Sequence, residues 1–310
     1  MRGTHHLRPA LLFCALLLQC VCAVGADKQA LYFIDAHSQV DQTIDLDTVI
    51  SLMNQAGVQT TILSAVAARS SRDIVIFARQ HPDRIIPAVR MKRRAFNDND
   101  AEYFADLKAE VDSGQFRAMS EVMMYHAQKG GRAPEIVVYP DDDRVQAALR
   151  YAVAQNWPFI AHIEFASPSI RDRSRFMRQF EAMLDTYPGH PFALAHLGQL
   201  STGDIRRLIV AHGNLYFLTS RSNPVAAHEG RQPWVNMFRG PVLAPEWREL
   251  AIRYPDRFVL SFDNVRPEMW GAFYLAEARV WRRALSELPD PVAQAIAHGN
   301  AERLWKIPPR

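Results

Sequence analysis

The stretch Leu31-Tyr32-Phe33-Ile34-Asp35-Ala36-His37-Ser38-Gln39 determines how the rest of the chain is interpreted. Its apolar first half predicts a buried strand, and its polar second half follows without a break. A buried strand that ends in Asp and His carries those side chains to a solvent-accessible edge of the fold. Three later apolar runs have the same design and end in His162, His196 and Asp263. Strands that end alike predict one shared site at the carboxyl ends of a parallel sheet.

Apolar, strand-like runs alternate with helical patterns along the rest of the chain. We expect eight strands, at residues 31–37, 60–65, 84–89, 116–122, 158–163, 192–197, 215–219 and 258–262. A long loop rich in Pro, Gly and Trp precedes the last strand, at residues 221–245. Eight strand–helix units indicate an α/β fold with a single (β/α)8 TIM barrel, which typically has ~250 residues. An open doubly wound sheet is the alternative, but the glycine-rich first turn typical of that fold is absent.

The amino-terminal segment has the pattern of a secretory signal peptide. Arg2 and Arg8 precede an apolar run at residues 10–24, and small residues favour cleavage after Ala26 or, as a second option, after Ala23. The apolar run is shorter than the ~20 residues needed to span a bilayer. We therefore expect a signal peptide at residues 1–26 rather than an uncleaved anchor helix.

The composition is that of an ordinary globular protein, with 48% hydrophobic and 22% charged residues. A formal net charge of +3 gives no electrostatic footprint for nucleic acid or an anionic membrane. Cys14, Cys20 and Cys22 all lie in the signal segment, so the mature chain is expected to have no disulfide or thiolate ligand. We expect one periplasmic or secreted domain, residues 28–310, that acts on a small molecule. The sequence does not indicate its oligomeric state.

Five ionisable residues meet the rule that the carboxyl ends of barrel strands face the active site: His37, Glu121, His162, His196 and Asp263. Imidazole and carboxylate groups are the usual ligands of a zinc-like divalent ion. A buried His or Asp without a partner is costly, so their gathering needs a metal ion, mutual pairing or both. Any one of these histidines alone is more often a satisfied core residue. The prediction of a site therefore depends on the whole set.

The order of these residues resembles the pattern of the metal-dependent amidohydrolase superfamily, and in particular its amidohydrolase-related, decarboxylase-like branch. That pattern has Asp-x-His-x-His on strand one, a His after strand five, a His after strand six and an Asp after strand eight. This chain has Asp35-Ala36-His37-Ser38-Gln39, His162, His196 and Asp263, and its segment 299–305 resembles the family's closing Asn-Ala-x-Arg-Leu-Phe. The resemblance covers essentially the whole mature chain. It implies a TIM barrel, a divalent metal ion and hydrolysis of an ester, lactone or amide.

Gln39 stands where the family has its second His. An amide oxygen is a poorer zinc ligand than imidazole, so the single-metal site of the family would be weakened here. In two-metal relatives a strand-four acidic group joins the histidines of strands five and six, and Glu121, His162 and His196 would supply that set. We expect one divalent ion, most simply zinc, on that side. The complete set of predicted ligands is His37, Gln39, Glu121, His162, His196 and Asp263.

In a metal-dependent hydrolase, Asp263 and His196 are the predicted catalytic residues, and Arg221, just past the seventh strand, is a further candidate. Asp263 would accept a proton from water and pass it to the leaving group, and His196 would bind the ion or stabilise an oxyanion. Arg221 could hold a substrate carboxylate or carbonyl, although an ordinary surface Arg fits equally well. Glu121 could instead form a salt bridge to Arg90 or Arg117.

Three other functions remain open at this point. One is a lactonase that needs no metal, in which His and Arg polarise the carbonyl and Asp263 is the base. Another is a non-oxidative decarboxylase, because this branch of the family contains such enzymes. The third is a degenerate barrel that binds a small molecule without turnover, which Gln39 favours.

Several further residues receive lesser roles. Glu164 would orient a ligand if it shares the face of His162. The basic loop at residues 90–94 either attracts an anionic substrate or is simply solvated. Trp234, Phe238 and Trp247 either wall the pocket or pack the long loop. We expect five histidines not to be ligands: His126, His190, His212, His228 and His298.

Overall fold

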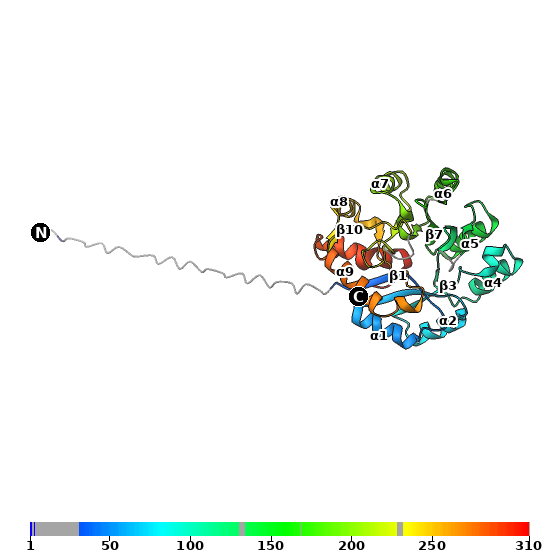
Figure 1. The fold of residues 1–310 in the computed structure, drawn as a ribbon. Coiled ribbons are helices and arrows are strands. Elements are labelled where there is room, and N and C mark those ends of the chain that lie inside the picture. The colour runs from blue at the N-terminus through cyan, green and yellow to red at the C-terminus, as the bar shows by residue number, and fades with distance from the viewer. Residues whose placement is uncertain (2, 4–30, 130–133, 168, 228–231, 310) are drawn as a thin grey trace. The chain divides into compact units, whose positions relative to one another are not determined.

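Helices surround a curled parallel sheet in the computed structural model, which describes residues 1, 3, 31–129, 134–167, 169–227 and 232–309 (Figure 1). Its contacts separate Met1–Ala30 from Leu31–Arg310, and the fold below is that of the second unit. The signal peptide predicted at residues 1–26 lies outside the described residues, except for Met1 and Gly3, and so does His228.

Two sets of hydrogen-bonded strands form the sheet. The first set has the order β1 (Phe33–Val40), β2 (Val58–Ala65), β3 (Ile85–Val89) and β4 (Ala118–Met119), all parallel. The second has the order β12 (Phe258–Val259), β9 (Leu215–Leu218), β8 (Phe192–Leu194), β7 (Phe159–Ile163) and β5 (Val122–His126), with β6 (Ile136–Val137) antiparallel at its edge. Ser120 and Glu121 connect β4 directly to β5. The fourth expected strand therefore belongs to both sets.

Main-chain hydrogen bonds also link β1 to the chain that follows β12. The amide of Ala36 donates to the carbonyl of Leu260 (3.0 Å), and the amide of Asp263 donates to the carbonyl of His37 (2.8 Å). Gln39 continues the series by donating to the carbonyl of Asn264 (2.6 Å). The first and last predicted strands therefore lie side by side, which brings the ends of the two strand sets together.

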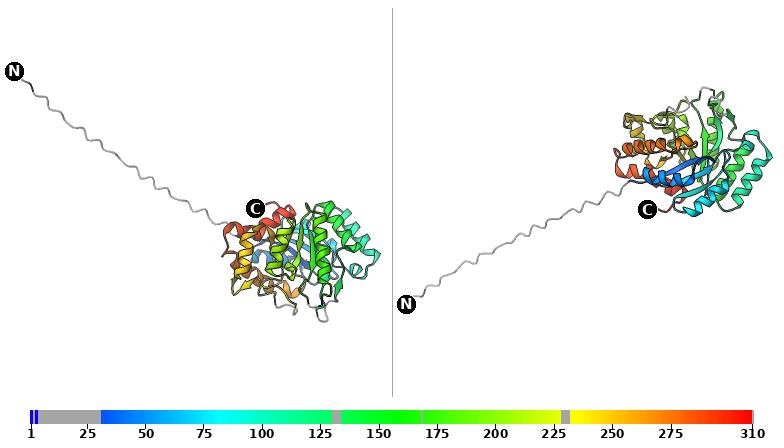
Figure 2. Two further views of the ribbon diagram at one scale, coloured as in Figure 1. Left: turned by 90° about the horizontal axis from the view of Figure 1, so that it is seen from above. Right: turned by 60° about the horizontal axis from the view of Figure 1, so that its bottom comes forward.

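Helices follow most of the strands, and most of them lie on the outside of the sheet (Figures 1 and 2). They are α1 (Leu46–Ala56), α2 (Ser71–Gln80), α3 (Arg94–Asp98), α4 (Ala101–Asp112), α5 (Asp143–Gln155), α6 (Arg173–Thr186), α7 (Thr202–Ala211), α8 (Pro245–Arg253), α9 (Ala272–Leu285), α10 (Asp290–Gln294) and α11 (Asn300–Trp305). Ser70 and Ser201 cap α2 and α7 by accepting from main-chain amides, and Gly57 ends α1 with φ of 67°. No described helix is long and apolar enough to cross a membrane.

The core has two layers because side chains alternate along the strands. Phe33, Leu63 and Val89 belong to a large cluster that includes the buried side of the helices, and we call this cluster the outer core. Ile34 and Ile62 belong to a second cluster to which most of the parallel strands contribute, together with residues of α11.

Several predicted elements differ from the structure, and one of them is the eighth strand, which ends at Val259 rather than at residue 262. The sixth strand ends at Leu194 rather than at residue 197, and a tight turn, Ala195–Gln199, follows it. The fourth strand is interrupted at residues 120–121. The long loop contains an antiparallel pair, β10 (Phe238–Arg239) and β11 (Val242–Leu243), that periodicity could not reveal because each strand has only two residues.

Candidate functional site

A bulge in β1 directs His37 and Gln39 toward the site. Phe33 and Val40 both pack in the outer core although they are an odd number of positions apart. Regular alternation would place them on opposite faces, so the strand must be irregular. Its register against β2 shifts between Phe33 and Ile34 and again, at the bulge, between Asp35 and Ser38. Asp35 holds the bulge by accepting from the amides of His37 (3.2 Å) and Phe262 (3.0 Å).

Glu121 lies at the centre of the site, fully buried between β4 and β5. Its Oε1 faces the first strand, 3.5 Å from Nε2 of His37 and 3.3 Å from Nε2 of Gln39. Its Oε2 faces the later strands, 2.8 Å from Nδ1 of His162 and 3.8 Å from Nε2 of His196. One carboxylate therefore joins the two halves of the predicted ligand set.

His162, at the end of β7, is held between two carboxylates. Its Nδ1 contacts Glu121, and its Nε2 lies 3.1 Å from Oε1 of Glu164. Glu164 is fixed in turn by the main-chain amide of Ala127 (2.9 Å) and by the ammonium of Lys129 (2.8 Å). Glu164 thus orients the His162 ring, which agrees with the lesser role that the sequence suggested.

His196, Arg221 and Asp263 each follow a strand in the left-handed backbone conformation, with φ of 54°, 61° and 56°. Such conformations are costly for residues other than glycine and cluster at functional sites. The turn after His196 is tight, because a Cβ on Gly198 would lie 2.6 Å from Cδ2 of Leu194. The turn that contains His196 directly follows β8 and accounts for the early end of that strand.

Asp263 completes a group of contacting side chains, called the central group below, that also contains His37, Glu121, His162 and His196. Its Oδ1 lies 3.4 Å from Nε2 of His37, and its Oδ2 lies 3.7 Å from Nε2 of His196. Arg221 lies against it, with Nε 3.5 Å from Oδ2 and Nη2 donating to the Asp263 carbonyl (2.9 Å). Nη1 of Arg221 is buried and has no hydrogen-bond partner among the described residues.

Opposing charges keep both central carboxylates ionised. Burial alone would raise the pKa of Glu121, but Lys92 and His162 hold that pKa well below its usual range. Burial would also raise the pKa of Asp263, and the charges of Lys92 and Arg221, with a hydrogen bond from His37, hold that pKa below its usual range instead. Both groups are therefore available as anionic ligands or as a base at neutral pH.

The three histidines differ in protonation when no ion is bound. Burial alone would lower the pKa of His37, but the carboxylates of Glu121 and Asp263 raise it to about 9. Burial likewise opposes protonation of His162, yet Glu121 raises its pKa. Burial and the nearby charge of His162 lower the pKa of His196 to about 3. An ion bound at His162 would displace a proton, whereas His196 is already neutral.

The donor atoms fit a divalent ion. Glu121, His162 and His196 form one group, and His37, Glu121 and Asp263 form another, with the donor atoms of each within 4.8 Å of one another. Imidazole nitrogens and carboxylate oxygens are the donors that zinc and similar ions bind. The hydrogen bond from His162 to Glu164 supplies the outer carboxylate that metal-binding histidines commonly have.

Gln39 presents its NH2 group to the site. Nε2 donates to Glu121 and to Oδ1 of Asp263 (3.4 Å), while Oε1 is buried and has no hydrogen-bond partner among the described residues. An amide binds a metal only through its oxygen. Gln39 would therefore have to rotate its amide to act as the predicted ligand.

Lys92 and Lys129 are site residues that the sequence did not single out. Lys92 forms an ion pair with Glu121, so the alternative partners Arg90 and Arg117 were wrong. Lys129 lies 4.4 Å from the ring centre of Trp234, which is 5.0 Å from that of His196. The basic run after the third strand was the available signal, but it did not distinguish Lys92 from its neighbours.

The structure places some of the lesser candidates beside the site and others away from it. Trp234 lies beside the site, whereas Phe238 and Trp247 are buried in the outer core. His190, His212 and His298 contact residues outside the central group: Phe192, Glu181 with Asp185, and Glu302 with Tyr32, respectively. His126, which we expected not to be a ligand, forms a third group of possible donors with His162 and Glu164.

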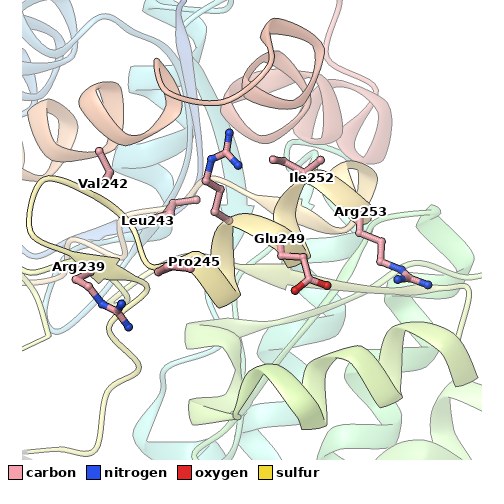
Figure 3. Close-up of a pocket in the computed structure, with 8 residues that line it drawn as sticks. Arg239, Val242, Leu243, Pro245, Glu249, Ile252 and Arg253 are labelled. Atoms are coloured by element: carbon pink, nitrogen blue, oxygen red, sulfur yellow. The ribbon is translucent and has the colours of Figure 1, made fainter.

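A surface pocket of about 640 Å³ lies elsewhere, at α8 and the β10–β11 pair (Figure 3). Its lining is Arg239, Val242, Leu243, Pro245, Arg248, Glu249, Ile252 and Arg253. It contains no residue of the central group, so size alone does not identify the chemical site.

Comparison with known proteins identifies the family and similar folds. The family model described as Amidohydrolase matches residues 34–307. An uncharacterised TIM-barrel protein from Bordetella bronchiseptica has a similar structure, with 18% identity, a TM-score of 0.55 and coverage of 85% of this chain and 83% of that one. A 4-oxalomesaconate hydratase from Rhodopseudomonas palustris has 15% identity, a TM-score of 0.55 and coverage of 89% and 96%.

A putative 2-pyrone-4,6-dicarboxylic acid hydrolase from Pseudomonas putida is also similar, with 14% identity, a TM-score of 0.52 and coverage of 90% of this chain and 99% of that one. At these identities the likeness concerns the fold alone. No curated protein matches the chain.

Proposed function

The chain belongs to the amidohydrolase family, and on this premise we propose that it is a metal-dependent hydrolase acting on an ester, lactone or amide of a small molecule. The observation that carries the proposal is the double role of Glu121. Its two oxygens face two groups of donors, and the atoms of each group lie within 4.8 Å of one another. The hydrolase and the hydratase among the structural neighbours support water-dependent chemistry on a small molecule.

The ion we propose is zinc or a similar divalent cation, held by Glu121, His162 and His196. When bound, it supplies Lewis-acid polarisation of a carbonyl and lowers the pKa of water toward ~7. Asp263 is held ionised beside Arg221, and it accepts the proton of the attacking water and passes it to the leaving group. Arg221 Nη1, which is buried and still has hydrogen-bonding capacity, holds a substrate oxygen.

A second candidate is a hydrolase that needs no metal, with the same base. The ion pairs Lys92–Glu121 and Arg221–Asp263 favour it, because they already neutralise the two central carboxylates. In that case protonated His162 and the two cationic side chains would polarise the carbonyl. Asp263 would remain the group that takes the proton from water.

Removal of metal separates the two candidates. We expect chelated and dialysed protein to lose at least about 100-fold of its turnover on a panel of esters, lactones and amides, because both the polarising charge and the acidified water are lost. Addition of Zn²⁺, Co²⁺ or Mn²⁺ should restore it. Full activity in protein shown by elemental analysis to be metal-free would instead establish the second candidate. No turnover on any substrate, with or without metal, would favour a binding protein.

We also propose that the curled sheet closes as a (β/α)8 barrel. The hydrogen bonds between β1 and the chain after β12 support closure, as does the likeness to a TIM-barrel protein. A closed sheet would bring all the strand ends that carry candidate residues to one mouth.

We further propose that the protein is exported to the periplasm or secreted. The charged start, apolar run and small residues of its first 26 positions support this. We expect mature protein from the natural host to begin at Val24 or Asp27, as measured by amino-terminal sequencing. A soluble cytosolic protein that retains Met1 would contradict export.

A further inference from the structure

We infer that Lys92 is an internal counter-cation that occupies the first-strand side of Glu121 and limits the site to one divalent ion, bound on the His162–His196 side. This inference rests on the proposed metal site, and it concerns a residue to which the family pattern described above gives no role.

The loop after β3 holds Lys92 in a fixed position. The amide of Arg90 donates to Oε2 of Glu110 (3.1 Å), and the amide of Met91 donates to Oγ of Ser120 (3.1 Å). The Met91 side chain is buried in the outer core. Both anchors come immediately before Lys92, so the direction of its side chain is set by the fold.

The other basic residues of this loop are engaged elsewhere. Arg90 donates to the carbonyls of Ala67 (2.7 Å) and Arg69 (3.3 Å). Arg93 pairs with Asp106 and Glu110. Arg94 has a 94% exposed side chain and pairs with Asp98. Lys92 is thus the member of the basic run that turns into the site, which makes the prediction of a merely solvated loop wrong at this position.

The two oxygens of Glu121 have different partners, and this decides where an ion fits. Lys92, His37 and Gln39 all contact Oε1, whereas His162 and His196 face Oε2. A protonated Lys has three donors and no lone pair, so it cannot join a metal as a ligand. The ion pair with Glu121 keeps this side chain in its ordinary charged form. A divalent ion at Oε1 would have to displace this cation or suffer strong repulsion from it.

Gln39 adds to the difference between the two sides of Glu121. It supplies an NH2 group rather than an imidazole on the Oε1 side. The first-strand side therefore has one fewer nitrogen ligand and one additional cation, while the His162–His196 side keeps its complete donor set. The chain's own residues therefore fill the first-strand side of Glu121.

Titration of the metal-free protein with Co²⁺ tests this inference without an activity assay. We expect wild-type protein to saturate at one ion, by calorimetry and by visible absorbance. Lys92→Gln should bind Co²⁺ at least about tenfold more tightly and take up a second ion, because a local positive charge is removed. Arg94→Gln removes a charge from the same loop without touching the site and should match wild type. Lys92→Arg keeps the charge and should also remain at one ion.

The outcomes distinguish the inference from the proposed function. If wild type binds one ion and Lys92→Gln binds with the same affinity and number, Lys92 has no such role although the metal site stands. If wild type binds none and Lys92→Gln binds one, Lys92 replaces the metal and the metal-dependent function fails. Binding by neither overturns both. A second ion bound by wild type itself overturns the inference even if the Lys92 variants do not fold.

Discussion

Replacing Asp263 with Asn is expected to lower kcat by about 10²- to 10⁴-fold on any substrate the protein hydrolyses. An amide has nearly the shape of a carboxylate but cannot accept a proton from water. The contact of Arg221 with the Asp263 main-chain carbonyl does not depend on the side chain and should persist. Both the metal-dependent and the metal-free candidate need this base, so the loss should appear whichever is correct.

The control for this variant is Asp112→Asn, which removes a carboxylate from an exposed position on α4. It should leave kcat unchanged. Metal content must be measured alongside, because Asp263 is also a predicted ligand. A loss of kcat at unchanged metal content identifies a base, and a parallel loss of both identifies a ligand. Turnover within about threefold of wild type would exclude Asp263 from every hydrolytic mechanism considered above.

The position of the polar side chains near the carboxyl ends of the strands was predictable from sequence, because burial and polarity change at nearly the same place, although the strand bounds themselves differ. Apolar runs that stop at His37, His162, His196 and Asp263 contain both the strand and its polar end. The order of strands and helices followed from the same periodicity, and the family match over residues 34–307 agrees with the resemblance inferred from these motifs. Local sequence was sufficient for these predictions, since each motif is contained in a few consecutive residues.

The details that control the chemistry depend on long-range contacts instead. The bulge in β1 reverses which residues face the site, and it is held by the amide of Phe262, far along the chain. The ion pair of Lys92 with Glu121 joins two different strand ends, and nothing within the basic run distinguishes Lys92 from its neighbours. The left-handed turn at His196 shortens its strand in a way that hydrophobic periodicity cannot report.

Replacing His162 with Ala is expected to weaken metal binding by more than about 100-fold, since losing even an outer partner of a ligand costs 10- to 100-fold. Gln39→Ala should change the metal affinity far less, because Gln39 presents its NH2 group rather than an oxygen that could bind the metal. Gln39→His should raise occupancy on the His37–Asp263 side. Elemental analysis after dialysis measures all three.

The His162→Ala variant should still fold, so its metal content can be compared with that of the other variants. Its removal leaves Glu121 paired with Lys92 and Glu164 paired with Lys129, so neither buried carboxylate loses its only cation. The matched control is His190→Ala, which truncates another buried histidine, one that packs against Phe192 outside the central group. Equal metal content in the His162, Gln39 and His190 variants would mean that the ion is held by other groups. A selective loss at His162 would instead locate the ion at Oε2 of Glu121, on the side that Lys92 leaves free.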